Sequence, residues 1–161
     1  MAKLVFGILM TVVWWMFHAL QMDEELAMNT VFDAKHAVNR AAHAAAQQVD
    51  RDKLEIGVLS LDREQAEAAA LTYLRENLRL DAELNPLPGS FLRNRVLVEQ
   101  FAVLGEELAY PFTYRNEAFD YEVTLDRPGV VLIVRVAFPR LFGVLAPVEW
   151  DLKGSAEMVY D

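Results

Sequence analysis

The histidines of this sequence are the residues whose type and spacing most readily suggest chemistry. Two of the three, His36 and His43, lie seven residues apart, with Asp33 close to the first. On a helix, residues seven apart share a face but stand about 10 Å apart, whereas metal-binding pairs on helices favour a spacing of about four residues. We therefore interpret His36 and His43 as solvated or inter-subunit polar groups rather than metal ligands.

Other patterns that would indicate catalysis or cofactor binding are missing from the sequence. The 161 residues contain no cysteine, which excludes disulfides, thiolate metal sites and a cysteine nucleophile. There is no Gly-rich phosphate loop, G-x-S-x-G motif, H-E-x-x-H motif or calcium-loop spacing. A net charge of -9 argues against a nucleic-acid partner, because such proteins need basic side chains to neutralise phosphates. The sequence predicts a protein that is not an enzyme and has no catalytic residue, cofactor or metal.

An apolar segment near the N-terminus explains why 54% of the residues are hydrophobic. From Leu4 to Met22, nineteen consecutive residues carry no formal charge. A helix that crosses a bilayer needs ~20 such residues. A signal peptide is the alternative, but the expected small-residue cleavage site is missing and Asp23 follows directly. The sequence predicts an uncleaved transmembrane helix over residues 1–22 and a soluble head over residues 23–161.

The charges that flank this segment predict its orientation. Lys3 precedes the segment, whereas Asp23, Glu24 and Glu25 follow it. Positively charged flanks remain in the cytoplasm, so we expect the N-terminus inside and the head outside the cytoplasmic membrane. The acidic residues most simply stop the segment from sliding inward, and a contact with Lys3 of a neighbouring subunit is a second interpretation. His18 lies within a turn or so of this acidic end and is expected to reach the interface.

The helical pattern continues beyond the apolar segment. Between Leu26 and Asp50 there is no Gly or Pro, and alanine, the best helix former, is abundant. Small and β-branched apolar residues recur there at steps of three and four, a helical stripe close to a heptad: Ala27, Val31, Ala34, Val38, Ala41, Ala45 and Val49. This stripe either packs against other helices or covers the sheet of its own head, and both can hold on different faces. A second helix is expected over residues 63–80, with Asp62 as N-cap and Gln65 in the capping-box position.

After Gly89 the hydrophobic pattern changes to the alternation typical of strands. We expect strands over residues 95–104, 119–125, 130–138 and 148–160, with turns at residues 126–129 and at Pro139 and Gly143, and with Gly154 as a candidate bulge. Hairpin-type connections predict one mostly antiparallel sheet of about four strands, covered on one face by the long helix. The expected fold class is α+β: a long N-terminal helix, a second helix and a C-terminal sheet.

This plan resembles that of type IV pilins and pseudopilins, and more closely that of TadE-like subunits of tight-adherence pilus systems, especially short members in Gram-positive bacteria. The similar segments are Phe32–Asp50, Gln65–Asp81 and Lys153–Asp161. Prepilins are cleaved after a glycine, with Glu at the fifth position that follows. Here the fifth residue after Gly7 is Val12, so we expect a subunit that assembles uncleaved or belongs to an offshoot of the family.

The resemblance implies a structural subunit of a bacterial extracellular filament. Such a subunit leaves the membrane with the help of pilus assembly machinery and packs its N-terminal helix against those of identical copies. Trp14 and Trp15 lie deep in the apolar segment, which also favours helix packing over a lone spanning helix. The residues expected in these contacts are Gly7, Leu9, Val13, Trp14, Phe17, Ala19, Ala27, Val31, Ala34 and Val38. The alternative is a single-pass anchored domain that binds a partner or assists secretion.

Overall fold

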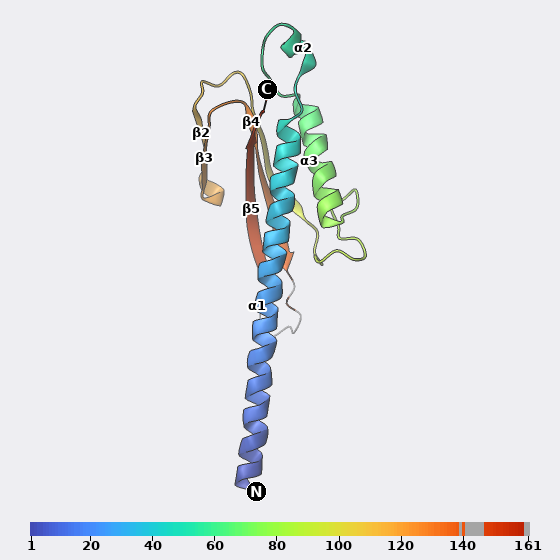
Figure 1. The fold of residues 1–161 in the computed structure, drawn as a ribbon, viewed down its shortest axis with the longest axis vertical. Helices are drawn as coiled ribbons and strands as arrows, with labels where there is room; N and C mark the ends of the chain where they lie inside the picture. Colours follow the sequence, from blue (N-terminus) through green and yellow to red (C-terminus); the bar gives the residue numbers. More distant parts are fainter. Residues whose placement is uncertain (139, 141–146, 160–161) are drawn as a thin grey trace.

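A computed structural model describes residues 1–138, 140 and 147–159 of the chain. Its longest element is α1 (Ala2–Ala46), whose first half extends alone while its second half is part of the head (Figure 1). The predicted unbroken helix is confirmed, because α1 has no proline and only one glycine, Gly7. It ends at Ala46 rather than Asp50, since the next residues turn back and Val49 forms an antiparallel bridge with Leu61.

Two shorter helices follow. The five-residue α2 (Arg51–Glu55) was not predicted; its N-cap is Asp50, whose carboxylate accepts a hydrogen bond of 3.1 Å from the amide of Lys53. Helix α3 (Arg63–Leu78) confirms the predicted second helix, ending two residues earlier than expected. Its predicted cap is also confirmed. Asp62 accepts hydrogen bonds from the backbone amide of Gln65 at 2.9 Å and from its side-chain amide at 2.7 Å.

The strands form two antiparallel sheets instead of the single sheet that the sequence predicted. The main sheet contains β1 (Leu97–Leu104), β4 (Gly129–Phe138) and β5 (Val148–Glu157) in the order β1-β4-β5. The second sheet is a hairpin of β2 (Phe112–Asn116) and β3 (Tyr121–Leu125), joined by the 3-10 turn η1 (Glu117–Phe119). The α+β class is therefore confirmed, whereas the predicted strand 119–125 pairs with β2 and not with the main sheet. The predicted turn residues Pro139 and Gly143 and the strand end at residue 160 lie outside the described residues.

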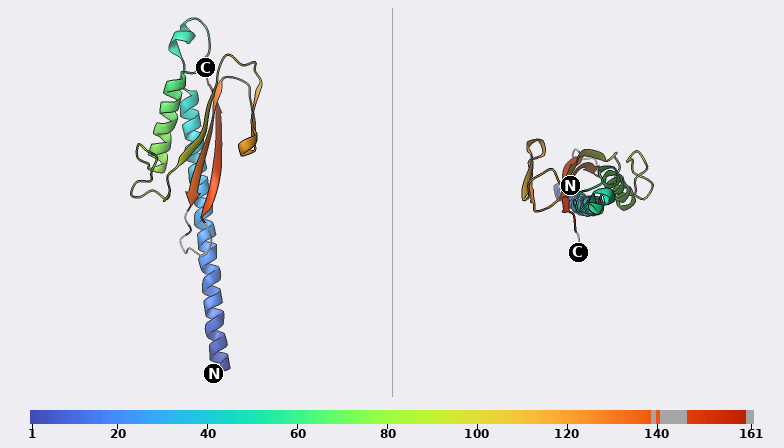
Figure 2. Two further views of the ribbon diagram at one scale, coloured as in Figure 1. Left: turned by 180° about the vertical axis from the view of Figure 1, so that it is seen from behind. Right: turned by 90° about the horizontal axis from the view of Figure 1, so that it is seen from above.

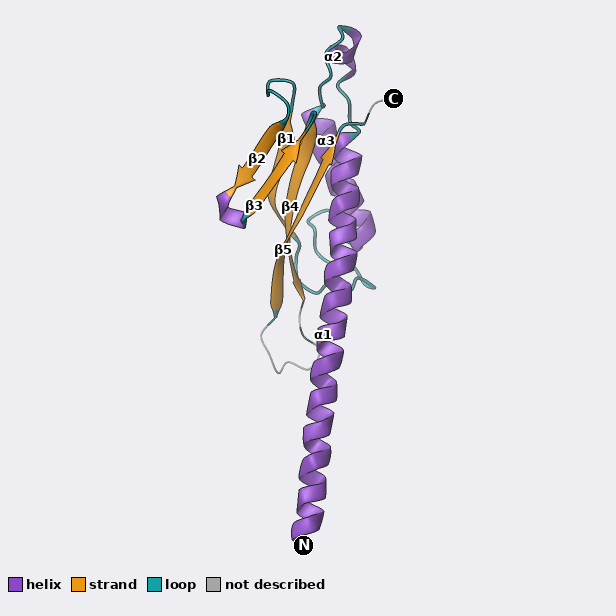
Figure 3. Ribbon diagram, turned by 60° about the vertical axis from the view of Figure 1, so that its left-hand side comes forward, coloured by secondary structure: helices purple, strands orange, loops and turns teal. Residues whose placement is uncertain are grey.

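The head is layered, with the helices on one face of the main sheet and the hairpin on the other (Figures 2 and 3). Helix α1 packs on β4 and β5, and α3 packs mainly on α1. The principal core lies between them. Its contacts are made by small residues of α1, such as Ala34 and Ala41, and by larger residues of the sheet, such as Leu132 and Val134, all at most 1% exposed. A second core lies on the outer face, where the hairpin covers Ile133.

At Gly154, α1 approaches the sheet closely. The pairing of β4 with β5 runs from Gly129–Glu157 to Phe138–Val148 without a shift in register, so the predicted bulge at Gly154 is wrong. A Cβ atom at this position would lie 2.9 Å from Cγ1 of Val38 and 3.2 Å from its carbonyl oxygen. The glycine is therefore required because the helix backbone leaves no space for a side chain. The irregular pairing is instead in β1, between Val98 and Gln100.

We predict that Gly154→Leu destabilises the head by about 1–3 kcal/mol, the usual cost of forcing extra carbon atoms into a packed core. Denaturant unfolding of the full-length protein in detergent measures this difference. Lys153→Val, one residue away on the opposite face of β5, is the control, and we expect it to change stability by less than about 0.5 kcal/mol. Equal stabilities of wild type and Gly154→Leu would contradict the assigned role of the glycine.

Candidate functional site

The first half of α1 presents a long exposed apolar surface. Its large side chains are exposed in the isolated chain, including Phe6 at 62%, Leu9 at 58% and Trp15 at 63%. By length and composition, α1 is the one helix among the described residues that could cross a membrane, and the segment that qualifies is not buried in the protein at all. A signal sequence would show the same properties. Long exposed apolar surfaces indicate contact with a membrane or with another protein.

The contact of α1 with the head begins directly after this segment. Asp23 is fully buried, and Ala27 and Thr30 are buried on the same side of the helix. Glu24 and Glu25 remain exposed. Of the predicted inter-subunit charges, Lys3, Glu24 and Glu25 therefore remain accessible to a neighbouring molecule, whereas the head of the same chain encloses Asp23.

The predicted assembly residues divide into two groups. Those before Met22 lie on the free half of α1: Gly7, Leu9, Trp14 and Phe17 are exposed, and Val13 and Ala19 are half-buried. The four later ones face the head. Ala34 and Val38 are 0% exposed, Ala27 is 7% exposed, and Val31 packs against the same core. For these four, the structure supports the alternative interpretation, in which the stripe covers the sheet of its own head.

Polar side chains on the free half of α1 make local contacts. The hydroxyl of Thr11 donates a hydrogen bond of 2.9 Å to the carbonyl oxygen of Gly7, one turn earlier. The rings of Trp14 and His18 meet edge to face, with centroids 4.3 Å apart. The imidazole of His18 thus packs on its own helix, and its nitrogens gain no hydrogen-bond partner from the residues that the structure describes.

The other two histidines lie apart on the surface of α1. Both His36 and His43 are exposed on α1. His36 lies at a shallow pocket of about 290 Å³, which it shares with Asp33, Arg40, Asn77 and Phe91. Among the residues that the structure describes, no three His, Cys, Asp or Glu side chains are close enough together to hold a metal ion.

A groove of about 520 Å³ between α3 and β1 was not predicted from the sequence. It forms because α3 leans on α1 and makes few contacts with β1, which leaves the edge strand of the main sheet half-covered. Its floor is apolar and its rim is charged: Leu74, Val96 and Leu132 lie at the floor, and Arg63, Glu67 and Arg95 are part of the rim. These residues offer binding contacts but no pair of nucleophile and base.

An ion-pair cluster ties the three strands of the main sheet together on their outer face. Arg135 of β4 lies 3.1 Å from the carboxylate of Glu99 in β1. It also makes two hydrogen bonds, of 2.8 and 3.3 Å, to the carboxylate of Asp151 in β5. Hydrogen bonding to Asp151 raises the pKa of Arg135 above its usual value. We interpret this cluster as structural, because all three partners satisfy one another.

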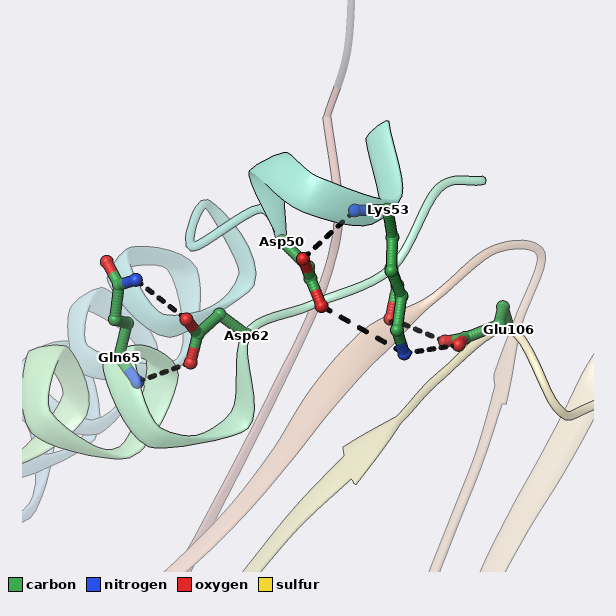
Figure 4. A network of polar contacts seen from close by, with 6 residues as sticks. Asp50, Lys53, Asp62, Gln65 and Glu106 are labelled. Carbon is green, nitrogen blue, oxygen red and sulfur yellow. Dashed lines mark hydrogen bonds and ion pairs between the residues drawn. The ribbon is translucent and has the colours of Figure 1, made fainter. Parts of the chain in front are cut away.

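A second polar network holds α2 against the loop after β1, at the end of the head farthest from residue 1 (Figure 4). Lys53 donates a hydrogen bond of 2.5 Å to the carboxylate of Glu106 and lies 4.0 Å from that of Asp50. Ser60 donates a further hydrogen bond to Glu106. Hydrogen bonds from Lys53 and Ser60 lower the pKa of Glu106 from 4.5 to about 2.

This network predicts a pH-dependent contribution to stability. Because the pKa of Glu106 is lower in the folded than in the unfolded state, its contribution is complete above the unfolded value of 4.5 and is lost as the pH falls through about 2. At pH 7 we expect Glu106→Gln to cost no more than about 1 kcal/mol, since the ion pair is accessible to solvent.

Urea unfolding of both proteins between pH 7 and pH 2 measures the difference, which should shrink below pH 4.5. Glu55→Gln, which removes a carboxylate of α2 that lies outside this network, is the control. A difference between wild type and Glu106→Gln that stays constant down to pH 2 would contradict the assignment.

No family model matches this chain, and no curated protein or solved structure shows significant similarity to it.

Proposed function

We propose that this chain is the structural subunit of a bacterial extracellular filament, similar in plan to pilins and TadE-like subunits. The observation that supports the proposal most strongly is the shape of α1. Its first half is apolar and free, and it continues without a break into the helix that forms the core of the head (Figure 1). A helix of this kind can be stored in a membrane and later packed against copies of itself.

The energetic reason is the cost of exposing residues 4–22 to water. Burying a side chain of Leu, Val, Phe or Met contributes about 1.5–3 kcal/mol, and this segment carries many such side chains. Before assembly the bilayer buries them, and after extraction only neighbouring helices can do so. The filament is thus a homopolymer whose interior replaces the lipid.

The flanking charges complete the proposal for localisation. Lys3 stays at the cytoplasmic side, and the exposed Glu24 and Glu25 lie at the outer surface of the cytoplasmic membrane. The head then faces the exterior, ready for assembly on the cell surface. In this role the chain is not an enzyme; it needs no cofactor, and its partners are its own copies and an assembly machinery.

The test is an exchange of the helix in the natural host. Residues 4–22 are replaced by a polyleucine segment of equal length, and sheared surface material is examined by negative-stain microscopy. We expect the wild type to give filaments that contain this chain. The polyleucine variant should remain in the membrane fraction and give none, because it can anchor but lacks the side-chain pattern that packs. Wild-type cells without such filaments would refute the proposal.

The groove between α3 and β1 favours a second candidate, a single-pass anchored domain that binds a partner outside the membrane. Its apolar floor and charged rim at the edge of a sheet suit an extended peptide. This candidate predicts that residues 23–161 act alone and that the polyleucine variant keeps full function. The same experiment therefore separates the two candidates.

A further inference from the structure

The polar residues of the membrane segment gather on one face of α1. Between residues 4 and 22, the residues outside the apolar set are Gly7, Thr11, His18 and Gln21. At about 100° per residue, these four lie within an arc of about 80°. Trp14 falls inside the same arc and packs on His18. We call these five residues the polar stripe.

The head leaves most of this face of α1 uncovered, and His36 lines a shallow pocket there with Asn77 and Phe91. The residues that contact the head, such as Asp23, Ala27 and Ala34, lie on the opposite side of the helix. The same helical repeat, continued toward the C-terminal end of α1, leads to Glu25, Phe32, His36 and His43, all of which are exposed. The described head therefore leaves the polar stripe itself, between residues 7 and 21, open to a second helix.

We infer that the polar stripe is the contact face between two parallel copies of α1 in the membrane, with each residue at the depth of its counterpart. The occupant is a second copy because two chains inserted in the same orientation place Gly7, Thr11, His18 and Gln21 at matching depths. A helix of another sequence would need the same polar residues at the same spacing.

Hydrogen bonding supports this pairing. The hydroxyl of Thr11 is satisfied within its own helix, but His18 and Gln21 gain no hydrogen bond from the residues that the structure describes. A neutral imidazole has one donor and one acceptor, and an amide has both. Two copies can therefore supply each other with hydrogen-bond partners near the edge of the bilayer, and Gly7 lets the backbones approach. At the aqueous end the two Glu25 carboxylates come near each other, where solvent and salt screen their repulsion.

The inference rests on the proposed function only in placing residues 4–22 in a membrane beside copies of the same chain. It adds the face, the parallel orientation and the register, which the filament proposal leaves open. Paired subunits of this kind would be the form in which the protein waits for assembly.

Disulfide cross-linking of the full chain tests the pairing, and the absence of natural cysteines makes every introduced cysteine unique. Thr11→Cys and His18→Cys place a thiol on the polar stripe, whereas Leu9→Cys and Leu20→Cys place one at similar depth on the opposite face. Native membranes are oxidised with copper phenanthroline and analysed on non-reducing gels. A disulfide forms only when the two Cβ atoms come to about 3.5–4.5 Å, so we expect a severalfold higher dimer fraction for the first two variants.

A second measurement separates contact from chance collision. Adding Gly7→Leu to the Thr11→Cys variant should lower the dimer fraction severalfold, because the larger side chain separates the helices, whereas adding Leu9→Ala should leave it unchanged. Equal cross-linking on both faces, a cross-link to a different protein, or no cross-link would each overturn the inference.

These outcomes are independent of the microscopy described above. Filaments without cross-links on the stripe would overturn the pairing and leave the proposed function intact. Cross-links without filaments would support the pairing and overturn the filament proposal.

Discussion

We expect Val13→Lys to abolish the proposed surface filaments, while the head stays folded and the protein stays in the membrane. A lysine at the centre of a spanning helix costs about 2.5–3.5 kcal/mol on insertion, which the remaining apolar residues can offset. In a packed helical core, an unpaired charge has no such compensation, and the penalty recurs in every subunit. Counting filaments in sheared material and fractionating the cells measure the two effects separately.

The matched control is Leu54→Lys, which makes a similar change at an exposed apolar residue of α2. It should leave filament numbers unchanged. A normal number of filaments from Val13→Lys cells would show that the first half of α1 does not form their core. Loss of the variant from the membrane fraction would instead show that the anchor, and not the packing, is the sensitive step.

Leu74→Ala has the largest expected effect on the stability of the head. Leu74, on α3, is 0% exposed and is part of the principal core. Truncating a leucine in such a position leaves a cavity and costs about 2–5 kcal/mol. Thermal or denaturant unfolding of the full-length protein in detergent gives the difference directly.

Leu54→Ala, at a side chain that is 48% exposed, serves as control and should change stability by less than about 0.5 kcal/mol. Because Leu74 also lies at the floor of the groove, the same variant tests whether α3 is held rigidly. A cost below about 1 kcal/mol, well under the usual range for buried leucine, would mean that α3 adjusts and closes the cavity.

The helices were predictable because their signals are local. Asp62 followed by Gln65 is a capping pattern, and the structure shows both hydrogen bonds. An uninterrupted run without Gly or Pro predicted the second half of α1. Which residues face the head was not decided by the same pattern, since a stripe such as Ala34 and Val38 suits a sheet of the same chain as well as another helix.

The division into two sheets depended on contacts far apart in the sequence. The segment 112–116 alternates in burial but is only five residues long, and no strand is predicted there from its sequence. A signal was present in β4, where Val130 to Val134 are at most 1% exposed. A strand that is apolar on both faces must be covered on both, and α1 can cover only one. The aromatic residues of the hairpin, such as Phe112 and Tyr121, supply the second cover.

The features of the candidate site were likewise predictable only in part. The exposed apolar half of α1 followed from composition alone, and its exposure in the structure agrees with that prediction. The groove between α3 and β1 depends on the angle at which α3 docks, which no local pattern encodes. The enclosure of Asp23 by the head was equally unforeseeable, because a carboxylate after an apolar segment normally reaches water.

Helix α1 continues without a break from the apolar segment into the core of the head. Its two halves therefore turn together about the helix axis. Val38 of α1 packs closely against Gly154 of β5, so the second half of α1 is held against the sheet. Rotation of the first half about its axis must therefore rotate the head by the same angle. Inserting one alanine after Met22 would turn the head by about 100° relative to the polar stripe, whereas inserting seven would nearly restore the original phase. In the proposed filament, the face of α1 that pairs in the bilayer would therefore set the direction in which each head points.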